Sequence, residues 1–309
     1  MKIVIPFVQI DAHNPNLSSR KTISASDTYF ECIVIAFASI KHWNPKFRLQ
    51  LTTNIPVREP FAYQLKELNV ETKIIDYAFN PPIEFGNSFR GCFYLFDAII
   101  AESEDVLYID PDVVCVGAIP QDIFKNCEIG ALDLRFADNK EINGISPSEA
   151  RKIYSQMYNR QELKSHNHYG GEAVFISKLV KDSLVSDIQK LWIANTSAAV
   201  RGESFLTTEE HILSLIFSDY LVSDLNSLIL RIWTTMHYNK IEGGTLEVQK
   251  PSLWHLPSEK SFGFHTAYRL NQKNQLFKFS DEAKNQSDLR KIFGIDKSKV
   301  SRILTRILS

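Results

Sequence analysis

The sequence of 309 residues is poor in cysteine, and its four cysteines form neither a CxxC pair nor a metal-finger spacing. This pattern is typical of a reducing compartment and predicts no disulfide framework. No apolar run approaches the roughly 18 residues that a membrane-spanning helix needs. The apolar start is interrupted at Gln9 and ended by Asp11, and no small-residue cleavage site of a signal peptide follows. We therefore expect a cytoplasmic protein.

The chain also lacks a strong overall charge, since its net charge is −1. This gives no bias toward nucleic acid, and we expect no nucleic-acid partner. The basic residues are concentrated in the tail, where 273–309 holds nine Lys/Arg and four Asp/Glu. From residue 297 onward, apolar positions recur at helical spacing between these basic residues. The segment 288–309 is thus typical of an amphipathic helix, either peripheral on a membrane or packed on the body.

No internal repeat, low-complexity segment or Gly/Ser linker divides the chain. We therefore predict one domain over residues 1–270, followed by a basic amphipathic appendage over 271–309.

What the sequence does contain is a regular alternation of strands and helices. An almost continuously apolar strand over 2–10 is followed by a buried helix from about 27 to 43. Strands over 47–52 and 70–77 enclose an amphipathic helix over 59–68. Such alternation predicts an α/β fold with a parallel sheet of the nucleotide-binding kind.

Two acids interrupt the most apolar part of this pattern. The run 106–109 predicts a buried strand, and Asp110-Pro111-Asp112 follows it directly before a second apolar run over 113–116. Buried carboxylates are costly unless they are paired or bound to a metal. Carboxylates at the carboxyl end of a central strand suit Mg²⁺ or Mn²⁺ held together with substrate phosphates. The alternative, a strand exit whose acids face water, stays open at this point.

Two later segments bring further reactive side chains. Thr208 precedes Glu209 and Glu210 at the start of a predicted helix. Acids at this position also interact favourably with the helix dipole. A short strand over 252–256 contains His255, and Lys260 follows it. A histidine at a strand end either has a structural role or binds a metal, and as a ligand its imidazole would favour a transition metal over Ca²⁺.

From Met1 to about Lys260, the order of these parts resembles the GT-A glycosyltransferases. The likeness is to the family 8 type, which includes bacterial lipooligosaccharide galactosyltransferases and glycogenin. It is carried by Asp27-Thr28-Tyr29, Arg90, Tyr94, Asp110-Pro111-Asp112, Asp133, Gly170-Gly171-Glu172, Glu209-Glu210-His211-Ile212-Leu213, His255 and Lys260.

The resemblance implies a Rossmann-like GT-A fold, in which helices flank a mostly parallel central sheet. It implies a hexose transfer from a nucleotide-diphosphate sugar, with retention and with Mn²⁺ or Mg²⁺ as cofactor. The metal ligands would be Asp110, Asp112 and His255, and Lys260 and Arg90 would meet the diphosphate.

The resemblance also implies roles around the sugar and the base. Glu209 or Glu210 would face the reacting sugar carbon, and Asp133 would accept hydrogen bonds from sugar hydroxyls. Glycines let a backbone approach a ligand closely. The expected donor-binding residues are therefore Asp27, Thr28, Tyr29, Arg90, Asp110, Gly170, Gly171 and Lys260.

The sequence departs from the family pattern in three places. Residues 11–26 are inserted before Tyr29, and Gly170-Gly171-Glu172 replaces the usual Asn-x-Gly. The segment from His255 to Lys260 is one residue short and lacks the family's glycine, and His265 competes with His255 as a ligand. The Gly-Gly strand and the acid-His helix also resemble family 6 galactosyltransferases.

The resulting hypothesis is a metal-dependent hexosyltransferase acting on a surface glycan or glycolipid, as in lipopolysaccharide or capsule biosynthesis. A sugar nucleotidyltransferase is one alternative, although it would need a glycine-rich loop after the first strand, and 11–26 contains no glycine. A catalytically inactive sugar-binding protein is the other alternative. The intact pair Asp110 and Asp112 argues against it.

Overall fold

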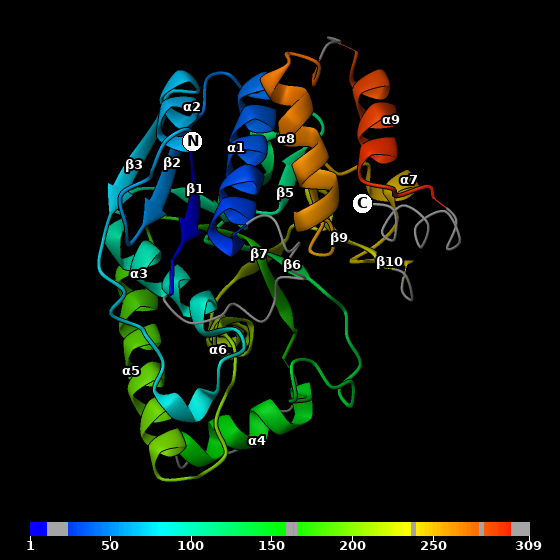
Figure 1. The fold of residues 1–309 in the computed structure, drawn as a ribbon. Coiled ribbons are helices and arrows are strands. Elements are labelled where there is room, and N and C mark those ends of the chain that lie inside the picture. Colours follow the sequence, from blue (N-terminus) through cyan, green and yellow to red (C-terminus); the bar gives the residue numbers. More distant parts are fainter. Residues whose placement is uncertain (11–23, 159–162, 164–165, 236–238, 278–280, 298–309) are drawn as a thin grey trace.

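The apolar strand at the N-terminus is an inner strand of a seven-stranded sheet, next to the central strand (Figure 1). The computed structural model describes residues 1–10, 24–158, 163, 166–235, 239–277 and 281–297. The expected loop over 11–26 therefore lies mostly outside the described residues. In sheet order the strands are β3 (Val70–Ile74), β2 (Arg48–Thr53), β1 (Lys2–Phe7), β4 (Val106–Ile109), β7 (Tyr169–Ile176), β6 (Ile129–Asp133) and β8 (Val222–Asp224).

This sheet is mostly parallel, as the sequence predicts. Strands β3, β2, β1 and β4 are parallel neighbours, and β7 alone runs antiparallel to both of its neighbours. The chain goes from β1 outward through β2 to β3 and then returns to add β4 on the other side of β1. The carboxyl ends of β1 and β4 thus flank the point where the strand order reverses, which is where open α/β sheets bind ligands.

A second sheet of four strands packs beside the first. Its order is β10 (Asn239–Glu242), β9 (Ile229–Thr234), β11 (Leu253–His255) and β5 (Val113–Cys115). Strand β4 belongs to the first sheet and β5 to the second, so the chain changes sheets at Asp110-Pro111-Asp112. Because a sheet change breaks the ladder, both acids are released from regular strand pairing at the junction.

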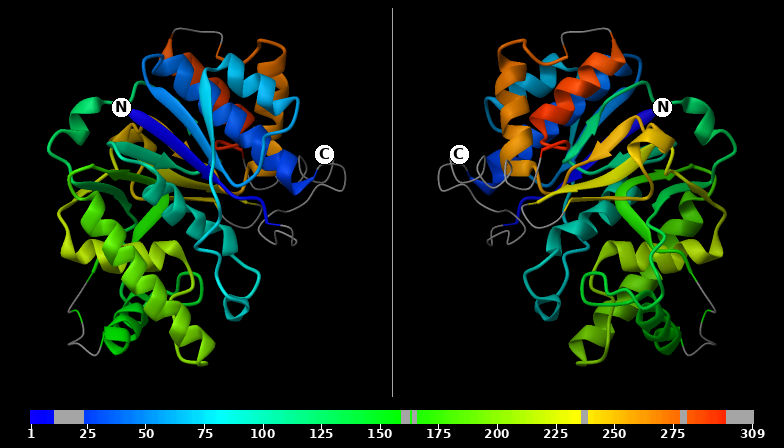
Figure 2. Two further views of the ribbon diagram at one scale, coloured as in Figure 1. Left: turned by 90° about the vertical axis from the view of Figure 1, so that its left-hand side faces the viewer. Right: turned by 90° about the vertical axis from the view of Figure 1, so that its right-hand side faces the viewer.

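The helices cover both faces of the main sheet (Figure 2). They are α1 (Ala25–Trp43), α2 (Phe61–Glu67), α3 (Tyr94–Ala101), α4 (Pro147–Tyr158), α5 (Lys181–Val200), α6 (Glu209–Ile216), α7 (Leu246–Gln249), α8 (His265–Gln272) and α9 (Glu282–Ile292). A 3₁₀ turn over Arg90–Phe93 directly precedes α3.

Each face of the sheet has its own hydrophobic core. On one face, α1 and the second sheet pack on Ile3, Ile5 and Leu107. On the other, α3, α5 and α6 pack on Val106 and Tyr108. Alternating residues of β4 thus point into opposite cores, which explains why its sequence is apolar throughout.

The described part of the tail lies against the body (Figure 1). Leu289, Phe293 and Ile295 are buried in the same core as α1 and the second sheet. Residues 298–309, where the amphipathic pattern is clearest, lie outside the described residues. The domain boundary at residue 270 and the membrane contact of 288–309 remain predictions. Across the described residues, the helices are all too short or too polar to cross a membrane.

Candidate functional site

The sheet junction brings together the three predicted metal ligands. One ligand atom each from Asp110, Asp112 and His255 lies within 4.8 Å of the others. Nε2 of His255 is 3.5 Å from Oδ2 of Asp110 and 3.4 Å from Oδ2 of Asp112. Asp112 and His255 are buried, whereas Asp110 is partly open to solvent. His265 is not at this place, because its Nδ1 pairs with Glu31 at 2.8 Å.

Backbone pairing explains how residues so distant in sequence meet. His255 pairs with Val113 across the antiparallel ladder of β11 and β5, and the amide of Leu256 donates to the Asp112 carbonyl at 3.0 Å. On the main sheet, the amide of Asp110 donates to the Glu172 carbonyl at 3.1 Å. The position of the triad is thus fixed by hydrogen bonds of both sheets.

Opposing charges dominate the electrostatics of the triad. Burial lowers the pKa of His255, but the Asp112 and Glu172 carboxylates outweigh burial and raise it to about 10. Burial acts to raise the pKa of Asp112, yet Lys260 and His255 hold it far below its ordinary value. The site therefore concentrates negative charge that these cations balance.

Lys260 lies beside the triad, as predicted. Its Nζ donates to Oδ2 of Asp112 and to the Pro257 carbonyl. The ammonium also lies 5.9 Å from the centre of the Tyr29 ring. Tyr29 stands at the N-terminal part of α1, so this helix presents an aromatic face next to the candidate metal site.

A buried arginine, Arg231, connects the triad to the acids of α6. Its Nε and Nη2 donate to Oε1 and Oε2 of Glu172 at 2.8 and 2.7 Å, and Nη2 also reaches Oε1 of Glu210 at 2.5 Å. Glu210 further accepts the Gly171 amide at 3.1 Å. Burial raises the pKa of Glu210, but Arg231 and His168 outweigh it and bring the pKa far below its ordinary value.

Glu209, the neighbour of Glu210, has the opposite protonation behaviour. Burial and the adjacent Glu210 carboxylate raise the pKa of Glu209 to about 8. Thr208 caps the helix that carries both acids, accepting the His211 amide at 3.4 Å. The helix start predicted from the sequence is thereby confirmed.

The two glycines of β7 are required by these acids. A Cβ on Gly170 would collide with the Glu172 carboxylate, which folds back over that position. A Cβ on Gly171 would lie 2.6 Å from Oε1 of Glu209. Gly171 lines the pocket, whereas Gly170 is buried and is not among the described residues that line it.

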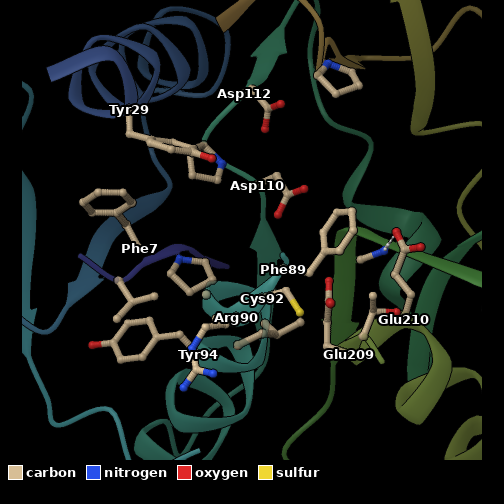
Figure 3. A pocket seen from close by; sticks show the side chains of 18 of the residues that line it. Phe7, Tyr29, Phe89, Arg90, Cys92, Tyr94, Asp110, Asp112, Glu209 and Glu210 are labelled. Carbon is tan, nitrogen blue, oxygen red and sulfur yellow. Dashed lines mark hydrogen bonds between the residues drawn. The ribbon is translucent and has the colours of Figure 1, made fainter. Parts of the chain in front are cut away.

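One cavity of about 480 Å³ is lined by the triad, Lys260, Arg231 and the two acids of α6. Figure 3 shows Asp110 and Asp112 on one side of it and Glu209 and Glu210 on another. Phe89 projects into it with a left-handed φ of 58° and a partly exposed ring. The walls therefore carry a candidate metal site, two carboxyl groups and several aromatic rings.

Two of the predicted site residues have other partners. Arg90 lines the cavity, but its guanidinium donates to the carbonyls of Pro82 and Gly86 and thus holds the preceding loop. Asp27 pairs with Arg58.

Two further predicted residues lie at the edge of the site. Asp133 accepts the Arg135 amide at 2.9 Å and the Asn167 side chain at 3.2 Å, and it is not among the described residues that line the cavity. Thr28 is buried within the first turn of α1, where its hydroxyl donates to the Ser24 carbonyl. Their expected contacts with the donor remain predictions.

Sequence reasoning missed Arg231 and gave no role to Glu172. A signal for Arg231 was present, since Ile229-Leu230-Arg231-Ile232 places one charge inside an apolar strand. A buried charge requires a partner. The partner was the glutamate that stands where the family pattern has its Asn-x-Gly motif.

Comparison with known proteins gives matches at the level of structure. An active-site mutant of LgtC matches with a TM-score of 0.55 at 13% identity, covering 93% of this chain and 100% of that chain. The galactosyltransferase LgtC in complex with donor and acceptor sugar analogues matches at 14% identity and TM-score 0.48, covering 83% and 87%. GlyE of Streptococcus pneumoniae TIGR4 matches at 13% identity and TM-score 0.45, covering 82% and 53%. No family model and no curated protein matches the sequence.

The chain has the GT-A glycosyltransferase fold. This confirms the predicted fold class and, at the level of the fold, the resemblance on which it rests. The donor set of Asp110, Asp112 and His255 fits Mn²⁺ or Mg²⁺, because it combines two carboxylates with one imidazole. Nδ1 of His255 is buried and has no hydrogen-bond partner among the described residues. A metal at Nε2 would give this imidazole a defined role.

Proposed function

We propose that the chain is a metal-dependent glycosyltransferase that transfers a hexose from a nucleotide-diphosphate sugar, with UDP as the nucleotide, to a glycan or glycolipid. The observation that carries the proposal is the convergence of Asp110, Asp112 and His255 beside Lys260 in the cavity of a GT-A fold. LgtC, whose fold it shares, has been crystallised with donor and acceptor sugar analogues.

The proposed roles near the diphosphate follow from charge and position. Asp110, Asp112 and His255 would hold the cation, which as a Lewis acid neutralises the charge that develops on the leaving diphosphate. Lys260 would add a second positive charge by turning from Asp112 toward a phosphate oxygen. Tyr29 offers a ring on which the base can stack.

The proposed roles near the sugar divide between the two acids of α6. Glu210 stays ionised because Arg231 and the Gly171 amide hold it, and its charge stabilises positive charge at the sugar carbon. Glu209 stays protonated below about pH 8 and can donate a hydrogen bond to a sugar hydroxyl. Retention of configuration belongs to the proposal on the strength of the family resemblance.

Titration calorimetry with UDP, in the presence and absence of Mn²⁺, tests the proposal. UDP is expected to bind at least tenfold more tightly with Mn²⁺, and Asp112→Asn is expected to abolish this gain, because it removes a charged ligand. Binding of UDP that does not depend on Mn²⁺ would overturn the metal-dependent mechanism.

Activity is tested by incubating the protein with a panel of nucleotide sugars. Slow release of free sugar and nucleoside diphosphate supports a transferase. Release of pyrophosphate from a nucleoside triphosphate and a sugar phosphate would identify a nucleotidyltransferase, and sugar binding without turnover would identify an inactive protein.

A further inference from the structure

Glu172 ends the segment Gly170-Gly171-Glu172, which replaces the family's Asn-x-Gly motif, and it lies beside the candidate metal site. Its side chain is fully buried, although it carries a charge. The Oε1 atom is 3.6 Å from Nδ1 of His255, and both carboxylate oxygens accept hydrogen bonds from Arg231. A carboxylate held in this way faces the ring nitrogen of His255 that points away from Asp110 and Asp112.

We propose that Glu172 is the positioning residue that orients His255 toward the metal, and that Arg231 ties this orientation to Glu210 on the sugar side. The inference rests on the proposed function, because it assigns a role within the same site. It assigns roles to two residues to which the family resemblance gives none.

The register of the strands brings these side chains together. His255 on β11 pairs with Arg231 on β9 in the second sheet. Paired residues on neighbouring strands direct their side chains to the same face of a sheet. On the main sheet, the Glu172 carbonyl accepts the Asp110 amide. Glu172 is thus fixed beside Asp110 by one sheet, and Arg231 beside His255 by the other.

Nδ1 of His255 is placed to donate a hydrogen bond to Glu172. A histidine that binds a metal through one nitrogen usually donates its other N–H to a carboxylate, which fixes the ring orientation and increases its basicity. Nδ1 of His255 is buried, has no hydrogen-bond partner among the described residues and faces Oε1 of Glu172. A small rotation of the ring closes this separation to a hydrogen bond and leaves Nε2 directed at Asp110 and Asp112.

Arg231 donates hydrogen bonds to two carboxylates at once. Its guanidinium holds Glu172 through two parallel hydrogen bonds and reaches Glu210 with one of the same nitrogens. A planar fork of this kind fixes orientation as well as charge. The metal half and the sugar half of the site therefore share one rigid connection.

The test measures the binding of Mn²⁺ alone to the full-length chain, by electron paramagnetic resonance of free Mn²⁺. Glu172→Gln is expected to weaken Mn²⁺ binding about tenfold or more, within the range known for carboxylates behind a metal-binding histidine. Arg231→Lys is expected to weaken it as well, because lysine cannot hold Glu172 at both oxygens. The double variant is expected to bind Mn²⁺ no more weakly than Glu172→Gln, since Arg231 acts through Glu172.

Glu102→Gln is the matched control. Glu102 is also buried and ion-paired, with Lys2 at 2.5 Å, and it lies outside the candidate site. Both glutamine variants are expected to lower the melting temperature, but only Glu172→Gln is expected to change the Mn²⁺ affinity. Equal Mn²⁺ affinities for Glu172→Gln and Glu102→Gln would overturn the inference and show that Glu172 is merely structural.

Failure of the inference is distinguishable from failure of the proposed function. If the wild-type chain binds Mn²⁺ and Asp112→Asn does not, the metal site stands, and an unchanged affinity of Glu172→Gln removes only the role of Glu172. If the wild-type chain binds no Mn²⁺, the proposed metal dependence falls together with this inference. Should Glu172→Gln fail to fold, Arg231→Lys and Glu172→Asp provide the same comparison.

Discussion

At the scale of single residues, Glu209 and Glu210 show how position alone separates two identical side chains. They are neighbours in sequence, yet Arg231 and the Gly171 amide bind only Glu210. Glu209 faces the cavity, where burial and the charge of Glu210 favour its protonated form. Two carboxyl groups with separated pKa values are typical of sites that use one as an acid and the other as an anion.

Glu209 predicts a dependence of stability on pH. Its pKa is about 8 in the folded chain, against an ordinary value of 4.5. The folded state therefore retains a proton that the unfolded state loses, and this contribution to stability decreases as the pH rises from 4.5 to 8. Glu209→Gln cannot ionise, so its melting temperature relative to wild type is expected to be higher at pH 8.5 than at pH 5.

At pH 8.5, Glu209→Gln is expected to raise the free energy of unfolding over that of wild type by about 2 kcal/mol. This is less than the free energy that corresponds to the full pKa shift, because solvent in the open cavity screens the charge of Glu209. Thermal unfolding at both pH values, without divalent cations, measures it. Glu67→Gln on the exposed surface of α2 is the control for the substitution itself. A melting-temperature difference that is the same at both pH values would contradict the protonated state of Glu209.

At the scale of elements, the positions of both acids depend on the first turn of α6. This helix has eight residues, and its first two are Glu209 and Glu210. Thr208 satisfies the first turn by accepting the His211 amide, and its hydroxyl lies 3.0 Å from Nδ1 of His211. Thr208→Ala is expected to lower the free energy of unfolding by about 1 kcal/mol. It is also expected to reduce sugar release from the donor about tenfold, because a frayed first turn displaces both acids.

Thr245→Ala is the matched control, because Thr245 caps α7 with the same bond length of 3.4 Å and lies outside the cavity lining. Donor hydrolysis and urea unfolding, measured on both variants, separate the cap from the site. If both threonine variants lose activity only in proportion to stability, the positioning role of the α6 start is refuted.

Much of this arrangement could be predicted from the sequence at the level of elements. The alternation of strands and helices predicts the parallel sheet. The position of Asp110 and Asp112 directly after a buried strand predicts that they line a ligand site at the end of that strand. The strand ending at His255 was also recognisable. Each of these signals is local, because burial and capping depend on neighbours along the chain.

The pairing of the second sheet could not be predicted in the same way. Directly after Asp112 the chain leaves the main sheet and forms β5 of the second sheet, in which β11 lies between β5 and β9. These contacts join segments far apart in sequence, so periodicity carries no information about them. For this reason the alignment of His255 with Arg231, and with it the role of Glu172, became visible only in the structure.

At the scale of the whole molecule, the described tail is connected to the site through the core. Phe293 follows α9, is fully buried and packs on Phe264 with ring centres 4.9 Å apart. Its ring also occupies the space that a side chain at Gly263 would need. Gly263 and Phe264 belong to the π-helical turn Lys260–Phe264, whose first residue pairs with Asp112. The tail thus supports the segment that carries a proposed phosphate contact.

Phe293→Ala is therefore expected to affect binding as well as stability. Loss of a buried phenyl ring costs about 3–5 kcal/mol, and the loosened turn is expected to weaken UDP binding several-fold at a temperature where the variant is folded. Phe47→Ala removes an equally large buried ring before β2, outside the cavity lining, and is the control. Calorimetric titration of both variants decides the point. If Phe47→Ala and Phe293→Ala bind UDP equally well, Phe293 stabilises the body without supporting Lys260.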